Sequence, residues 1–186
     1  MTQIGKFLWA ILAIASLSSA CSSSSNGSTY VRPKGRGSAA CQAWQKAICD
    51  YATLDCKSNL TEQDCVNEYY GITCLSDTTA QSCATALDSA TCTVMPANCN
   101  LQDIADPAPA IAACNGFIET ACNASVACGA STHDQCITEF QSALDCSTVN
   151  SLGLSYESCM SDVAKLSCNA DLPASCQGIF IAIKST

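Results

Sequence analysis

The spacing of the cysteines constrains this chain more than any other feature. Seventeen of the 186 residues are Cys, a fraction typical of disulfide-stapled domains. Sixteen of them fall into two sets of eight, and six of the seven steps between successive Cys agree within one residue between the sets. The first set is Cys41, Cys49, Cys56, Cys65, Cys74, Cys83, Cys92 and Cys99, and the second is Cys114, Cys122, Cys128, Cys136, Cys146, Cys159, Cys168 and Cys176.

The residues between the cysteines also repeat. An aromatic residue stands three positions after the first Cys of each set and another four positions after the fourth, and both sets close on Pro-Ala-x-Cys. These matched positions are Trp44 and Phe117, Tyr69 and Phe140, and the closing motifs at 96–99 and 173–176. Self-similarity of this kind indicates an internal repeat. We expect one module over residues 39–100 and a second over residues 101–186.

The apolar residues recur three and four positions apart, which is the helical period. Ser38, Thr61 and Thr132 stand where helix N-caps are expected, and Asp106 precedes Pro107 in a helix-start pattern. The patterns predict helices over residues 39–51, 61–74, 79–92, 108–123, 132–146 and 155–168. The expected fold class is all-α, with two tandem disulfide-stapled three-helix modules of eight Cys each. An apolar tail, Gly178 to Ile183, is expected to pack on the second module.

Helix geometry bears on the disulfides. Cys83 and Cys92 are nine residues apart on one predicted helix, as are Cys159 and Cys168, and nine residues turn a helix by two and a half turns. Each such pair should therefore face opposite ways and tie its helix to two neighbours. The pairing itself stays open, because eight Cys allow 105 connectivities.

The first twenty residues have the pattern of a signal peptide. Lys6 precedes an apolar run from Phe7 to Leu17, which is too short to span a bilayer, and small residues follow up to Ala20. Cys21 comes next, as in the lipobox of bacterial lipoproteins, although Ser18 stands where a lipobox usually has Leu. We expect Cys21 to carry the lipid. The alternative is ordinary cleavage after Ala20, which leaves Cys21 unmodified.

Residues 21–38 are expected to form the lipidated Cys and a flexible linker, because Ser, Gly, Pro and basic residues dominate there. Cys21 is also the odd cysteine, and setting it aside leaves an even sixteen for disulfides. Arg32, Lys34 and Arg36 either touch anionic headgroups or lie in a solvated linker. Ser22 is compatible with sorting to the outer membrane. The predicted location is the cell envelope, lipid-anchored in the outer membrane, on its periplasmic or extracellular face.

Composition and motifs exclude several chemistries. A net charge of −8 argues against nucleic-acid binding. The closest two cysteines, Cys122 and Cys128, are six residues apart, whereas zinc sites use pairs two to four apart. The one histidine, His133, lies in a predicted helix cap and is expected to be a solvated surface residue. We therefore predict no catalytic residues, no metal and no cofactor, and a protein that is not an enzyme.

Part of the second module resembles a known kind of protein. The runs Ser155 to Met160, Leu166 to Cys168 and Leu172 to Gly178 resemble small Cys-rich lipoproteins of myxobacterial type. The resemblance covers most of residues 109–180 and lies mainly in the Cys spacing and the closing Pro-Ala-x-Cys. It implies a location and a build but no activity, and it assigns no functional residues.

Together these features predict a non-enzymatic, lipid-anchored envelope or cell-surface protein. Its expected partners are the membrane, through the lipid, and an envelope or extracellular protein. The alternative is a periplasmic carrier of a small apolar ligand, because disulfide-stapled helices can enclose an apolar tunnel. Against carriage, the repeated aromatic positions are expected to be used in core packing.

Overall fold

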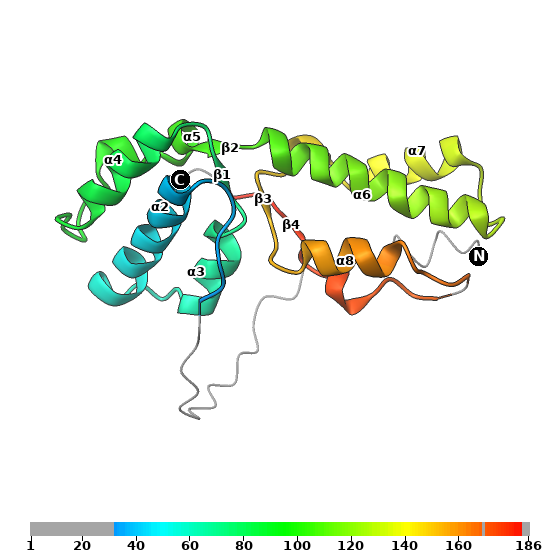
Figure 1. Cartoon of the computed structure of the whole chain (residues 1–186), viewed down its shortest axis with the longest axis horizontal. Helices are drawn as coiled ribbons and strands as arrows, with labels where there is room; N and C mark the ends of the chain where they lie inside the picture. The colour runs from blue at the N-terminus through cyan, green and yellow to red at the C-terminus, as the bar shows by residue number, and fades with distance from the viewer. Residues whose placement is uncertain (1–31, 169, 184–186) are drawn as a thin grey trace, which may run out of the picture.

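The computed structural model describes residues 32–183 apart from residue 169, and this part of the chain is mostly helical. Its helices form two groups that meet at short strands near the middle of the molecule (Figure 1). We call residues 32–106 the first lobe and residues 107–183 the second lobe. Each lobe has its own cluster of buried side chains. The expectation of a mainly helical, disulfide-stapled fold is confirmed.

The first lobe begins with its longest helix. Ser38, Thr61 and Ser76 cap its three main helices, each accepting a hydrogen bond from a backbone N–H of the first turn. The elements are α2 (Ala39–Asp50), a π-helical extension (Tyr51–Asp55), α3 (Glu62–Tyr69), β1 (Thr73–Cys74), α4 (Asp77–Leu87), a 3-10 turn (Ala97–Cys99), α5 (Leu101–Ile104) and β2 (Ala105–Asp106). Strands β1 and β2 pair antiparallel.

The second lobe has a similar order of elements. Thr132 forms the expected capping box with Gln135, and Asp106 accepts a hydrogen bond from the backbone N–H of Ala108 at the start of the long helix. The elements are α6 (Ala108–Ala127), α7 (His133–Ala143), a 3-10 turn (Cys146–Thr148), β3 (Ser151–Leu152), α8 (Tyr156–Val163), a second 3-10 turn (Ala174–Cys176) and β4 (Phe180–Ile181). Strands β3 and β4 pair antiparallel.

Several helices end earlier than their apolar pattern predicts. Helix α4 stops at Leu87, before a segment with the β-branched residues Thr91, Thr93 and Val94, which favour helices poorly. Helix α8 likewise stops at Val163. The argument that Cys83 and Cys92, or Cys159 and Cys168, share a helix and face opposite ways is therefore wrong in its geometry. Each pair nevertheless binds two different partners.

All sixteen described cysteines are in disulfides, and each disulfide stays within its lobe. The first lobe has Cys41–Cys74, Cys49–Cys65, Cys56–Cys92 and Cys83–Cys99, and the second has Cys114–Cys146, Cys122–Cys136, Cys128–Cys168 and Cys159–Cys176. Counted in order within each lobe, both sets pair first with fifth, second with fourth, third with seventh and sixth with eighth.

The repeated aromatic positions meet in the same way in both lobes. Trp44 packs edge-on against Tyr69 with ring centroids 6.2 Å apart, and Phe117 packs edge-on against Phe140 at 6.1 Å. Phe180, from the apolar tail, adds an edge contact to Phe117 at 5.4 Å. The tail therefore packs on the second lobe, as expected, but it also reaches further, because Ile183 packs against the buried cluster of the first lobe.

The two long helices differ by one residue between their second and third half-cystines. Seven positions separate Cys49 from Cys56, whereas six separate Cys122 from Cys128. In the first lobe this stretch is the π-helix Tyr51–Asp55, and in the second lobe α6 stays α-helical to Ala127. A π-turn holds one residue more than an α-turn, so the extra residue of the first lobe is absorbed without displacing its disulfide.

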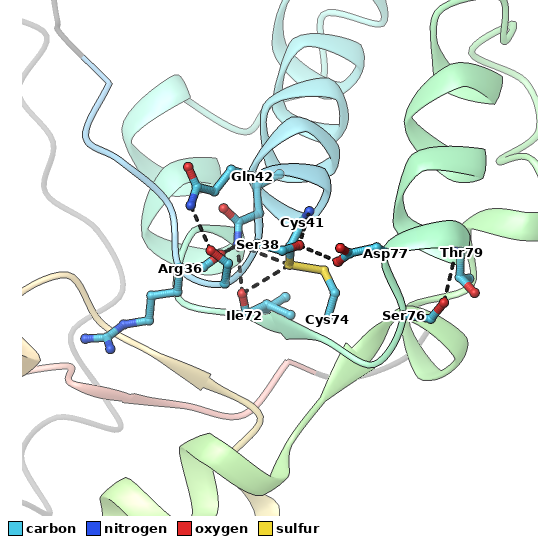
Figure 2. Close-up of a disulfide and its surroundings, with 11 residues drawn as sticks. Arg36, Ser38, Cys41, Gln42, Ile72, Cys74, Ser76, Asp77 and Thr79 are labelled. Atoms are coloured by element: carbon cyan, nitrogen blue, oxygen red, sulfur yellow. Dashed lines mark hydrogen bonds between the residues drawn. A yellow bond between two sulfur atoms is a disulfide. The ribbon is translucent and has the colours of Figure 1, made fainter.

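Residues 32–38, which the sequence assigns to a flexible linker, lie against the first lobe. The backbone N–H of Arg36 donates to the carbonyl of Tyr70 at 2.9 Å. The buried Gln45 side chain donates to the carbonyls of Arg36 at 3.0 Å and Ile72 at 2.7 Å. Figure 2 shows this junction around Cys41–Cys74, where the Ser38 hydroxyl also binds the Asp77 carboxylate. Backbone groups and polar side chains make these contacts, which is why a count of apolar side chains misses them.

The lobes are joined by a close backbone contact. The N–H of Leu152 donates to the carbonyl of Gly71 at 3.3 Å, and the Ser151 hydroxyl donates to the carbonyl of Glu68 at 3.0 Å. Beside them, the Arg36 guanidinium lies 5.6 Å from the Tyr156 ring centroid and 3.1 Å from a Glu157 carboxylate oxygen. A Cβ on Gly71 would lie 1.8 Å from the Leu152 carbonyl oxygen. This position therefore needs a residue without a side chain.

We expect Gly71→Ala to open the joint between the lobes, because the added methyl cannot fit against Leu152. The measurement is amide hydrogen exchange, with protection of the Leu152 N–H lost while the helices of both lobes keep theirs. Gly116→Ala, on α6, is the matched control, since nothing lies within 4 Å of a Cβ added there. Equal protection of Leu152 in the two variants would contradict the described joint.

A second prediction concerns the residue after the third half-cystine of each lobe. Lys57 has φ +46° and Gly129 has φ +65°, so both are left-handed. That conformation costs a residue with a Cβ about 1–2 kcal/mol, and the extra chain entropy of Gly offsets about 0.5–1 kcal/mol of it. Lys57→Gly should therefore raise the free energy of unfolding by up to about 1.5 kcal/mol, and Gly129→Ala should lower it. Denaturant unfolding with disulfides intact measures both, and the same sign for both would refute this reading.

Candidate functional site

The sixteen cysteines that the sequence groups into two sets form disulfides in the structure. Cys21, the expected lipidation site, lies outside the described residues. The other sixteen are in disulfides, so their sulfurs are neither thiolate nucleophiles nor thiolate metal ligands. Within residues 32–183, leaving out 169, no group of three or more His, Cys, Asp and Glu side chains is placed to hold a metal ion.

His133 is the first residue of α7 and bridges to the neighbouring helix. Its Nε2 lies 2.9 Å from a Glu119 carboxylate oxygen on α6, and its Nδ1 lies 3.9 Å from an Asp134 carboxylate oxygen. The side chain is 41% exposed, so the expected surface position holds, with Glu119 as a partner that the sequence did not indicate. The contact ties α6 to α7 at the protein surface.

A partly enclosed, mainly apolar cavity of about 240 Å³ lies at the outer end of the second lobe. It is lined by the C-terminal half of α6, the buried side of α7 and the segment after α8, around the Cys128–Cys168 disulfide. Figure 1 shows the end of α6 and the start of α7 at the end of the second lobe away from the first lobe. Its lining is Ala121, Ala124, Ser125, Cys128, Gly129, Ala130, Cys136, Phe140, Val163, Leu166, Ser167, Cys168 and Leu172.

The chemistry of this lining is apolar with two hydroxyls. Phe140 and Val163 are buried, whereas Ser167 is exposed at the surface, so the cavity runs from the core of the lobe towards solvent. Ser125 and Ser167 supply the polar side chains of the lining, and Ser125 shares a 3.0 Å hydrogen bond with Ser131. Such a site suits an apolar molecule that carries at most one or two polar groups.

Small side chains on α6 leave the cavity open. Ala121 and Ala124 face it from the helix, where larger residues would fill it. No motif in the sequence pointed to this site. The available signal was a comparison of the two Cys sets, because the positions matching Ala121 and Ala124 in the first set are Ile48 and Tyr51.

Arg32, the first described residue of the linker, binds acidic partners in the first lobe. Arg32 is bridged to Asp50 and Glu62, each at 2.6 Å, and Lys46 also reaches Asp50 at 2.5 Å. Partial burial by itself raises the pKa of Asp50, but hydrogen bonds from Lys46 and Arg32 outweigh it and hold that pKa below its ordinary value. Arg32 is thus engaged with the protein itself, and the headgroup contact considered above would have to displace these bridges.

None of the described helices combines the length and the apolar character needed to cross a membrane. Comparison of the chain with protein-family models, with curated proteins and with solved structures finds no match. The site is therefore argued from its own geometry.

The ion pairs of Arg32 predict how the free energy of unfolding depends on pH. Because the pKa of Asp50 is lower in the folded protein, its contribution is present above the ordinary Asp pKa near 4 and is lost as the pH falls through the folded value. Asp50→Asn should lower the unfolding free energy at pH 7 by on the order of 1 kcal/mol, and this deficit should shrink below about pH 4. Denaturant unfolding at pH 7 and pH 3 measures the deficit. Asp55→Asn controls for the change in net charge, and a deficit as large at pH 3 as at pH 7 would be inconsistent with the bridge.

Proposed function

We propose that this protein is a non-enzymatic, lipid-anchored binding module of the cell envelope. The observation that carries the proposal is the pairing of all sixteen described cysteines, which leaves Cys21 as the odd one. Disulfides in this number form and persist outside the cytoplasm. A chain that is exported, and whose odd cysteine directly follows a signal-peptide pattern, fits attachment to a membrane through that cysteine.

The two lobes are, in this proposal, copies of one three-helix module. Support comes from the identical order of disulfide pairing, from the two edge-to-face aromatic pairs and from the left-handed residue after each third half-cystine. Each module is about the size at which a hydrophobic core alone is marginal. Disulfides can then stabilise the module, and with it a binding surface, although few of its residues form a hydrophobic core.

The anchor would hold the first lobe near the membrane. Residues 22–31 separate Cys21 from Arg32, the first residue bridged to the fold, and ten residues reach at most about 35 Å. The tether is thus shorter than the linker expected from the sequence. The body it holds is acidic, because the charge of residues 41–186 is −12 from sixteen acids and four Lys, so it repels anionic surfaces.

A protein partner is the first candidate for what the module binds. Leu54 and Val94 are 61% and 73% exposed, and Met95 is 46% exposed. They flank the Cys56–Cys92 disulfide at the end of the first lobe. Exposed apolar residues beside a disulfide suit a contact with another protein.

A small apolar ligand is the second candidate, and the cavity of the second lobe is the observation that favours it. Extraction of the purified protein discriminates between the two. A bound small molecule favours carriage, whereas an empty cavity together with saturable binding to a purified surface protein favours the interaction module.

The anchor is tested by Cys21→Ser in a Gram-negative host. We expect the wild-type protein in the membrane fraction, with its intact mass raised by acyl chains, and the variant in the soluble periplasmic fraction. Ser22→Ala is the control and should fractionate as the wild type does. An unmodified Cys21 in the wild type, or a variant that stays in the membrane, would show that the anchor is elsewhere or absent.

Alkylation before and after reduction tests the other half of the proposal. The sixteen body cysteines should resist alkylation until a reductant is added, because each is held in a disulfide. Two or more body cysteines that react without reduction would reopen redox or metal chemistry.

A further inference from the structure

The cavity of the second lobe has a counterpart in the first lobe that is filled by side chains. Counted from the second half-cystine of each lobe, Ile48 matches Ala121 and Tyr51 matches Ala124. Both Ile48 and Tyr51 are buried, at 5% and 7% exposure. The first lobe therefore places a phenol ring and a branched side chain where the second lobe has two methyl groups and an open volume.

The surroundings of the two places also correspond. The cavity lining includes Phe140, Val163 and Leu166, and the residues at the same counts in the first lobe are Tyr69, Leu87 and Ala90, which all belong to the first buried cluster or pack against it. The same disulfide, third to seventh, borders both places. The second lobe thus keeps the residues that surround this space, but it lacks the two larger side chains that fill the space in the first lobe.

We propose that this cavity binds a small monocyclic phenol, in the place that the Tyr51 ring occupies in the first lobe. An apolar cavity of about 150 Å³ already accepts benzene, and pockets for drug-sized ligands begin near 300 Å³. At about 240 Å³ the cavity suits one ring with a short substituent. The inference deepens the second candidate function above and rests on the cavity alone, independent of the lipid anchor.

The first lobe also indicates where the hydroxyl of such a ligand would lie. The Tyr51 hydroxyl donates a hydrogen bond of 2.9 Å to the carbonyl of Thr91, the residue before the seventh half-cystine. The residue before the seventh half-cystine of the second lobe is Ser167, which lines the cavity. A buried phenol needs a partner for its hydroxyl, and Ser167 is placed to supply one. A ligand with a hydroxyl should therefore bind more tightly than the same ring without one.

The first experiment titrates p-cresol, which is the side chain of tyrosine as a free molecule, into the purified wild-type protein. We expect saturable binding with a dissociation constant on the order of 0.1–1 mM, which is reasonable for so few atoms. Amide NMR shifts should be confined to the residues around the Cys128–Cys168 disulfide. Toluene, which lacks the hydroxyl, should bind at least several-fold more weakly.

Three variants locate the site. Ala124→Tyr should fill the cavity and abolish binding, and Ala121→Ile should weaken it at least several-fold with a smaller change in volume. Ala127→Tyr is the matched control, because it adds the same ring to an exposed position of α6 outside the cavity, and it should bind p-cresol as the wild type does.

The reverse change in the first lobe gives an independent test. Tyr51→Ala should open a second cavity, so that the variant is less stable, binds two molecules of p-cresol and regains part of its thermal stability when p-cresol is added.

The inference is overturned if the wild type shows no saturable binding, or if folded Ala124→Tyr binds as the wild type does. Should Ala124→Tyr fail to fold, the Ala121→Ile variant decides the matter on the same criterion. Membrane fractionation of the Cys21→Ser variant reports on the anchor separately. A protein that is anchored but does not bind p-cresol loses this inference alone.

Discussion

The disulfide between the second and fourth half-cystines, Cys49–Cys65 in one lobe and Cys122–Cys136 in the other, fastens the long first helix to the helix that follows it. The remaining bridges hold the N-terminal half of the long helix, the residue that follows it and the closing 3-10 turn. The eight bridges together close loops of 14 to 40 residues, and each removes about 3–4 kcal/mol of chain entropy from the unfolded state. A chain with only 6% aromatic residues can therefore maintain two separate small cores. The cavity of the second lobe is part of this covalent framework too, because Cys128 and Cys168, which form a disulfide, belong to its lining.

The periodic features of the sequence predicted the mainly helical, disulfide-stapled fold well. The Cys spacing, the aromatic positions and the caps at Ser38, Thr61 and Thr132 depend on contacts within a few residues or on a pattern repeated along the chain. Helix ends were predicted less well, because α4 and α8 stop at Leu87 and Val163, before the second half-cystine of each predicted helix. Local propensity explains the end of α4 but not that of α8, which is followed by the good helix formers Ala164, Lys165 and Leu166. The pairing, the binding of residues 32–38 and the joint at Gly71 were not predictable, since each joins segments whose meeting depends on the whole fold. The cavity belongs to this group too, because it results from what α6 lacks rather than from a motif it carries.

The lobes are alike in the order of their disulfide pairing, and one place where they differ is the turn of the long helix after its second half-cystine. There the first lobe has an extra residue, a π-turn and the buried ring of Tyr51, whereas the second lobe has a regular helix and Ala124. Tyr51 is itself the first residue of the π-helix, so the extra residue and the buried ring occur in the same turn of the chain. The framework that both lobes share is thus compatible with a filled interior in one and an open interior in the other.

The arrangement of the lobes gives the two ends of the molecule different surroundings. Arg32, the first described residue, is bridged to the first lobe, and the cavity lies beside the C-terminal half of α6, at the end of the second lobe remote from the joint (Figure 1). The joint is made by backbone groups in close contact at Gly71 and Leu152 and by Arg36 against Tyr156, so it fixes one lobe relative to the other. The residues that line the cavity all belong to the second lobe, whereas the contacts of Arg32 belong to the first. Binding in the cavity therefore requires no rearrangement of the segment that joins the N-terminal residues to the fold.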